Sequence, residues 1–483
     1  MNTVVSCRYG TLQGIQENGC AAFYNVPYAQ GAGRFRCAAE PAPWQGIYDA
    51  AKPGPLFPQN RSRLHTVMGE QENLPQDENA FALNIWTPDT GGNYPVLLWI
   101  HGGGWLTGGA GLSWYNGSNL AREGIVVISV QYRLGVMGNL YLPEISDGNL
   151  AVHDLVSAIA WIKENISAFG GDASCLTIAG QSAGAWYAAA LLGIKELRGT
   201  FKRAILCSFP GGIEPLSRED ALQMSTLLQK ELHINDVHAL ERVPVQDLLA
   251  AQSRVSEEMQ RRKNQMMAPV FLPYADHQWI QDDIIAAAAE NCRDTVSILA
   301  GITGQETMAF LNSSPISNRR QIYQAIVKMS TQHIFLNPVL TLMNRFSANG
   351  SRVYAYQFDY PCRNKKIQAC HCIDLPFLFG NFECWKNAPM CDFASEGDSA
   401  KEAGQLSVQL QSALVQFVKD GTPKGRIPVE WPAYRAESKM VLRFQPQARA
   451  AMLEKNPLTQ RQIAAFLQIG KWKSRIYMAF HKD

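Results

Sequence analysis

Short runs of apolar residues, each bounded by turn-forming residues, recur along the chain. They occupy residues 96–100, 125–130, 176–179, 204–207, 296–301 and 353–358. Apolar runs of this length without alternation are typical of strands that are buried on both faces of a sheet. We therefore predict that these six segments are strands of one interior sheet.

Between these runs, apolar residues recur at helical spacing. One stripe consists of Leu155, Ile159, Ile162 and Ile166, and a second of Leu406, Leu410, Leu414 and Phe417. Each stripe predicts a helix with one buried face. Buried strands that alternate with such helices are typical of a mostly parallel sheet covered by helices on both faces. The pattern thus predicts an α/β fold.

The 483 residues would suggest two or three domains by length alone, but no repeat or linker divides them. We predict one domain over residues 1–483. Residues 211–290 lack a strand pattern and are expected to form a helical cap inserted over a site. Residues 359–403 show no clear period and are expected to form long ordered loops.

Charge and composition exclude several classes of protein. Lys and Arg number 44 against 42 Asp and Glu, and no long run of one sign occurs, which argues against a nucleic-acid partner. Neither a secretory signal nor 18 uninterrupted apolar residues is found, so no membrane association is expected. The eleven cysteines are scattered, as in a cytoplasmic protein with reduced thiols.

The strongest chemical signal is Gly180-Gln181-Ser182-Ala183-Gly184, between the apolar run LTIA and the helix-forming AWYAAALL. A strand, a tight turn and a helix are the context in which G-x-S-x-G presents a nucleophilic serine. Without that context the motif is common by chance, and a structural turn is the alternative.

A second signal is His101-Gly102-Gly103-Gly104-Trp105, which follows the apolar run PVLLWI. Consecutive glycines after a buried strand can direct backbone N–H groups into one cavity, where they stabilise an oxyanion. A phosphate-binding loop is disfavoured because no Gly-Lys-Ser/Thr follows. A glycine turn that serves only packing remains an alternative.

These motifs resemble the type-B carboxylesterase family, which includes cholinesterases and bacterial p-nitrobenzyl esterases. The matching segments are Gly33-Arg34-Phe35, LNIWTP, HGGGW, VQYRLGVMGN, ENISAFGGDAS, GQSAGA, HCIDLPFLFG and a late WPAY. They extend over nearly the whole chain in the family's order. The resemblance implies an α/β-hydrolase fold and a serine carboxylic ester hydrolase that acts on a small-molecule ester without metal or cofactor.

The resemblance also implies the other site residues. Ser182 would be the nucleophile, Glu306 the acid and His371 the base. The oxyanion would be bound by the backbone N–H groups of Gly103, Gly104 and Ala183. A loop histidine at position 371 and a surface carboxylate at position 306 are the alternatives. Arg34 with Glu78 resembles a structural ion pair, and Ser208 with Asp374 a second polar cluster behind the histidine.

Three departures from the family pattern affect the expected chemistry. Gln181 stands where the family usually has Glu, which should lower the pKa of His371; the alternative is that Gln keeps the same hydrogen bonds and that pKa changes little. Cys370 and Cys372 flank His371, but the spacing of the nearby cysteines fits no zinc site, the alternative here. The loop 58–79 lacks the family's disulfide and holds Glu70 where cholinesterases have the Trp that binds quaternary ammonium.

Substrates are expected to be uncharged esters of small to medium size. The tentative substrate-binding residues, each of whose aromatic members could instead be core, are Trp105, Gln181, Trp186, Phe335 and Phe377. A catalytically silent binding or adhesion protein of the same fold and an interfacial lipase are the alternative functions. The chain is expected to be a monomer or a weak homo-oligomer.

Overall fold

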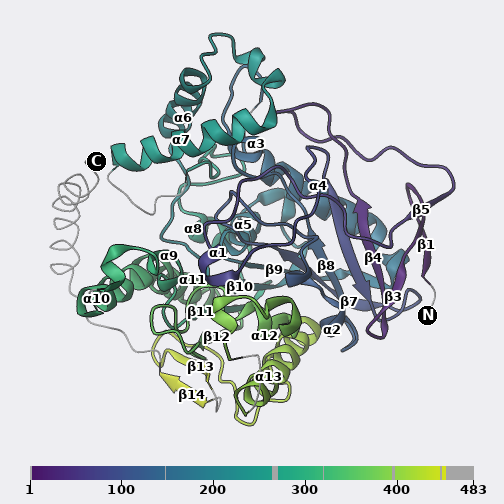
Figure 1. Cartoon of the computed structure of the whole chain (residues 1–483). Helices are drawn as coiled ribbons and strands as arrows, with labels where there is room; N and C mark the ends of the chain where they lie inside the picture. The colour runs from purple at the N-terminus through teal and green to yellow at the C-terminus, as the bar shows by residue number, and fades with distance from the viewer. Residues whose placement is uncertain are drawn as a thin grey trace.

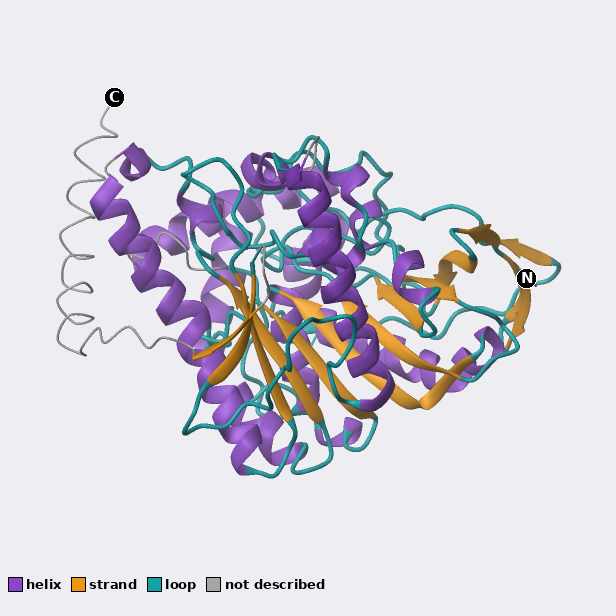
Figure 2. Ribbon diagram, turned by 90° about the horizontal axis from the view of Figure 1, so that it is seen from below, coloured by secondary structure: helices purple, strands orange, loops and turns teal. Residues whose placement is uncertain are grey.

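A large mixed sheet lies at the centre of the molecule and is covered by helices on both faces (Figure 1, Figure 2). The computed structural model describes residues 3–146, 148–263, 270–318, 320–393, 398–445 and 449–452. Within these residues the sheet has eleven strands. In spatial order they are β14 (Arg449–Met452), β13 (Met440–Phe444), β12 (Val353–Phe358), β11 (Ser297–Thr303), β10 (Phe201–Cys207), β9 (Gly171–Gln181), β7 (Tyr94–Ile100), β8 (Val126–Val130), β6 (Ala82–Thr87), β4 (Cys20–Pro27) and β3 (Ile15–Glu17).

The strands from β8 through β7, β9, β10, β11 and β12 to β13 are paired in parallel, whereas β3, β4, β6 and β14 pair antiparallel at the two ends. All six strands predicted from apolar runs lie in the parallel part. They are buried on both faces, as in β8, where every residue is buried. The predicted α/β fold is confirmed.

Other strands were not predicted because polar residues interrupt their apolar runs. β6 contains Asn84, which is buried because its side chain donates a hydrogen bond to the carbonyl of Ala110 and accepts one from the N–H of Asn25. A buried polar side chain is tolerated only when it is paired in this way. A small separate sheet, β1 (Val4–Cys7), β2 (Gly10–Gln13) and β5 (Ile47–Asp49), was also absent from the prediction.

The helices form two layers, each over its own cluster of core residues. One layer includes α4 (Leu150–Asn165), α5 (Ala183–Leu192), α8 (Ile284–Asn291) and α11 (Asn337–Ala348). The other includes α2 (Ser118–Ala121), α12 (Leu375–Phe379) and α13 (Asp398–Asp420). The two predicted helical stripes belong to α4, with Ile166 in the turn that follows, and to α13. No helix in the described residues is long and apolar enough to cross a membrane.

Two segments were expected to differ from the regular alternation of strands and helices. Residues 211–290 form α6 (Arg218–Glu231), α7 (Val245–Lys263) and α8, and their described part has no strand; α6 and α7 lie at the top of Figure 1. Residues 359–403, expected to be loops, instead contain α12, short helical turns and the start of α13. That expectation was wrong because turns of three to five residues are too short to show a helical period.

A buried ion pair between Asp154 of α4 and Arg133, which follows β8, predicts where the fold is most sensitive to a lost charge. Arg133 forms two side-chain hydrogen bonds to Asp154, at 2.5 and 2.8 Å, and the two side chains are 5% and 0% exposed. Removing the carboxylate leaves the guanidinium buried and unpaired, so Asp154→Asn should lower the free energy of unfolding by about 3–5 kcal/mol.

Glu164, ten residues along the same helix, provides the matched control. It pairs with Arg8 at 2.7 Å, but the two side chains are 49% and 54% exposed. Glu164→Gln should lower the free energy of unfolding by less than about 1 kcal/mol. Urea unfolding of both variants measures the difference, and equal midpoints would contradict the prediction.

Candidate active site

Ser182 lies in a sharp turn between β9 and α5. Its φ of 58° and ψ of −126° are rare for a residue with a side chain, so the surrounding backbone must hold it there. A Cβ on Gly180 would lie 2.4 Å from the backbone of Gly184, and one on Gly184 would lie 2.0 Å from the carbonyl oxygen of Ile100. Both glycines are therefore required for the turn, which has the predicted strand–turn–helix context.

His371 and Glu306 meet although 65 residues separate them in the chain. Nδ1 of the imidazole lies 2.5 Å from Oε2 of the carboxylate, and both residues are 0% exposed. Glu306 follows β11 and His371 lies in the loop after β12, so the two side chains meet at the carboxyl edge of the parallel strands. A carboxylate in this position fixes the orientation of an imidazole and stabilises its charged form.

Backbone contacts hold the two loops against each other. The N–H of His371 donates to the carbonyl of Glu306 at 3.2 Å, and the N–H of Gln305 donates to the carbonyl of Ala369 at 2.9 Å. The second carboxylate oxygen of Glu306 accepts from the N–H of Thr303 at 2.8 Å. Both oxygens of the buried carboxylate are thus paired, which reduces the cost of burying its charge.

Gln181 contacts the other nitrogen of the imidazole, which would have to accept a proton from Ser182. Its amide nitrogen lies 3.1 Å from Nε2 of His371. An amide NH₂ can only donate, so in the neutral ring this contact matches the tautomer that carries its proton on Nδ1, facing Glu306. This is the tautomer of a base. No hydrogen bond of the Ser182 hydroxyl is found within the described residues.

Cys372 is a further neighbour of this nitrogen. The amide of Gln181 also donates to the sulfur of Cys372, at 3.3 Å. Cys372 has a φ of 74°, which residues other than glycine rarely adopt. Burial lowers the pKa of His371, but the sulfur of Cys372 and the carboxylate of Glu306 outweigh it and raise that pKa above its ordinary value. The carboxylate of Glu306 therefore favours the imidazolium once a proton arrives.

The glycine corner after β7 lies against the serine turn. A Cβ on Gly102 would lie 3.1 Å from Cβ of Ser182 and 2.6 Å from the side-chain oxygen of Gln181. Gly103 and Gly104 have φ of 125° and 62°, which glycine adopts readily. The backbone of this corner can therefore approach the serine more closely than any other residue type would permit.

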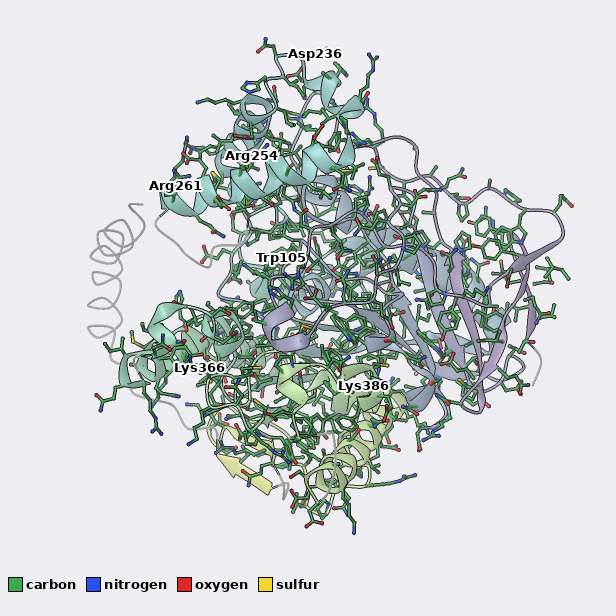
Figure 3. The ribbon with its side chains drawn as sticks, in the orientation of Figure 1. Trp105, Asp236, Arg254, Arg261, Lys366 and Lys386 are labelled. Carbon is green, nitrogen blue, oxygen red and sulfur yellow. The ribbon has the colours of Figure 1, made fainter. Side chains whose placement is uncertain are left out.

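Aromatic rings enclose His371 from two directions. Phe335 and Phe310 each lie with their ring centroids 5.2 Å from the imidazole. Trp105, near the centre of Figure 3, packs edge-on against Trp186 at 5.9 Å, away from the labelled outer residues. The sequence analysis missed Phe310, because no motif distinguishes it from other phenylalanines.

Phe377, the remaining tentative substrate-binding residue, lies elsewhere. Its ring contacts are with Phe358, Tyr360, Phe382 and Phe393, in the core on the other face of the sheet from Trp105, Trp186 and Phe335. The structure therefore does not bring Phe377 together with the rings that contact His371.

The remaining polar residues expected near the site are a structural ion pair and the residues Ser208 and Asp374. Arg34 and Glu78 form a two-bonded ion pair at 2.6 and 2.8 Å, as expected. Asp374 accepts from the hydroxyl of Tyr356 at 3.1 Å, and burial, aided by Glu306, raises its pKa to about 6. Ser208 is fully buried, and its hydroxyl has no partner among the described residues. No set of three metal-binding side chains occurs in the described part.

Comparisons with known proteins identify the family of the chain. A family model described as the carboxylesterase family matches residues 1–321 and 314–462. A probable N-octanoylanthranilate hydrolase of Rhodococcus erythropolis is 35% identical, over 91% of this chain and 97% of its own. The para-nitrobenzyl esterase of Bacillus subtilis is 30% identical, over 97% of this chain and 99% of its own length. The solved carboxylesterase EST55 of Geobacillus stearothermophilus has a TM-score of 0.81 and 29% identity, over 96% of this chain and all of that chain.

Gln181 contacts Nε2 of His371, so a negative charge introduced at position 181 provides the first test of the site. Gln181→Glu would place an anion against the imidazole and raise the pKa of His371 further, because the imidazolium gains an opposite charge. A base must be unprotonated to act, so the acidic limb of kcat/KM should move to higher pH, by at least about one unit. A pH–rate profile with an ester substrate measures the shift.

Gln305→Glu is the matched control. It introduces the same charge in a residue next to Glu306, but the amide oxygen of Gln305 accepts from the N–H of Ala369 rather than facing Nε2. Its acidic limb should move less. A Gln181→Glu profile that coincides with that of the wild type would show that Gln181 does not influence the base.

Proposed function

The chain belongs to the carboxylesterase family and hydrolyses carboxylic esters, and from this premise we propose that Ser182, His371 and Glu306 carry the reaction. One observation supports the assignment above the others. His371 is bonded to Glu306 through Nδ1, while its Nε2 faces Gln181, the residue next to Ser182.

In the first step Ser182 is acylated. Its Oγ attacks the ester carbonyl carbon while its proton passes to Nε2 of His371, and Glu306 stabilises the imidazolium. The tetrahedral intermediate then collapses, the bond from carbon to the leaving oxygen breaks, and the same proton leaves with the alcohol. The products are an acyl-serine and a neutral His371.

In the second step water replaces the alcohol. His371 accepts a proton from water as its oxygen attacks the acyl carbon, and returns that proton to Oγ of Ser182 as the acid leaves. In both steps the oxyanion accepts hydrogen bonds from the backbone N–H groups of Gly103, Gly104 and Ala183. The close approach of the glycine corner to Ser182 supports this assignment.

Neutral esters of small to medium size are the proposed general substrates. The rings of Phe335 and Phe310 beside His371 provide apolar surface for them, and Trp105 with Trp186 extends it. The relatives named para-nitrobenzyl esterase and carboxylesterase support para-nitrobenzyl and other simple carboxylic esters as the first substrates to assay.

Three further features belong to this proposal. Residues 211–290 act as a helical cap, supported by the hydrogen bonds that Arg34 donates to the carbonyls of Leu240 and Val243. A cytoplasmic location is supported by the eleven cysteines, all of which are free.

The chain acts as a monomer or weak homo-oligomer, which sedimentation of the purified protein tests.

Loss of the nucleophile should abolish turnover. Ser182→Ala should lower kcat for a para-nitrophenyl ester by roughly 10⁶-fold, because no acyl-enzyme can form. A fluorophosphonate probe should add its mass to the wild type and not to the variant. A wild type that neither reacts with the probe nor cleaves esters would favour a silent binding protein. A rate that rises abruptly above substrate solubility would favour an interfacial lipase.

Loss of the orienting carboxylate should be less severe. Glu306→Gln keeps the shape of the side chain but removes the charge that stabilises the imidazolium, so kcat should fall by about 10⁴-fold. Glu78→Gln is the control, because it alters a carboxylate of the structural pair with Arg34 and leaves the base untouched. Equal rates for both variants would exclude Glu306 from the triad.

A further inference from the structure

Arg63 places a positive charge beside the candidate active site. Its Nη2 lies 3.0 Å from the position that a Cβ on Gly104 would occupy. Its guanidinium carbon lies 5.4 Å from the ring centroid of Phe310, the same ring that packs against His371. Arg63 thus borders both the glycine corner and the aromatic neighbour of the base.

The guanidinium of Arg63 differs from that of its neighbour Arg61 in its partners. No hydrogen bond or ion pair of this side chain is found within the described residues, in contrast to Arg61, whose guanidinium forms two hydrogen bonds to Glu70. Desolvation lowers the pKa of Arg63, and no neighbouring carboxylate offsets that effect. The ring of Phe310 stabilises the cation in part, but no carboxylate among the described residues neutralises it.

The surroundings of Arg63 are nevertheless open to a ligand. The residue is exposed to solvent, although protein atoms surround its guanidinium densely enough to desolvate it. An anion that enters there would meet an unpaired planar group with several N–H donors, which suits the two oxygens of a carboxylate.

The place of Arg63 determines which anion this is. The N–H of Gly104 is assigned to the oxygen of the reacting carbonyl, and the guanidinium lies against the same glycine. An anion bound there during turnover would therefore be part of the ester itself. We propose that Arg63 is a specificity residue that binds a carboxylate substituent of the substrate, so that esters with such a group are preferred over neutral esters of the same size.

The inference rests on the proposed function and extends the expectation of neutral substrates. Two matched pairs of esters test it, compared by kcat/KM. Para-nitrophenyl hydrogen adipate against para-nitrophenyl heptanoate places the carboxylate on the acyl side. Para-carboxyphenyl butyrate against para-acetylphenyl butyrate places it on the alcohol side. The ratio of the anionic to the neutral member is the measurement in each pair.

In Arg63→Met the ratio should fall by about 10- to 100-fold in at least one pair, as expected for the loss of a charge-assisted hydrogen bond. Arg63→Lys should retain part of the preference, because the charge remains and the planar donor pair is lost. Arg61→Met, on the same loop, is the matched control and should leave both ratios unchanged, since Glu70 already neutralises Arg61.

A measurement on the wild type keeps the test independent of how the variants fold. Added salt should lower kcat/KM for the preferred anionic ester and leave its neutral partner nearly unaffected. Ratios that are the same in Arg63→Met as in Arg61→Met, or a wild type with no salt-sensitive preference, would overturn the inference while ester hydrolysis stands. A wild type that cleaves neither member of either pair would instead overturn the proposed function.

Discussion

The hydrogen bond between His371 and Glu306 is the constraint on which the rest of the site depends. A carboxylate buried with 0% exposure is tolerable only when its oxygens are paired, and here the imidazole and the N–H of Thr303 occupy both. The loops after β11 and β12 must therefore stay in register. The parallel pairing of these strands, from Ile298 with Val353 to Thr303 with Phe358, provides that register.

The same edge of the sheet also fixes the position of Ser182. β7 and β9 pair from Val96 to Ile100, so the glycine corner and the serine turn emerge side by side. Gly184 allows α5 to begin against the carbonyl of Ile100, where a larger residue would collide. The strain at Ser182 is thus maintained by packing on both sides, which is the usual condition for a strained residue to persist.

The sequence predicted the interior strands and the two motifs well, because each depends on local composition. Apolar runs and glycine spacing are visible without knowledge of the fold. Other features depend on contacts between distant segments. Asn84 lies in a strand because Asn25 and Ala110 pair with it, and Phe377 belongs to a different core from Phe335 although both were expected to bind substrate. Arg63 and Arg61 cannot be distinguished until Glu70 is placed.

The charges around the imidazole now form one pattern. Glu306 lies behind the ring, on Nδ1, where it stabilises the imidazolium without facing the substrate. At Nε2 the neighbour is the neutral Gln181, where the family resemblance leads one to expect a carboxylate, and Arg63, which has no carboxylate partner among the described residues, lies against Phe310. A carboxylate at position 181 would repel an anionic ester at the distance of the reacting carbonyl. The neutral amide and the free guanidinium therefore act in the same direction, and both favour a negatively charged substrate over the cationic one that a cholinesterase binds.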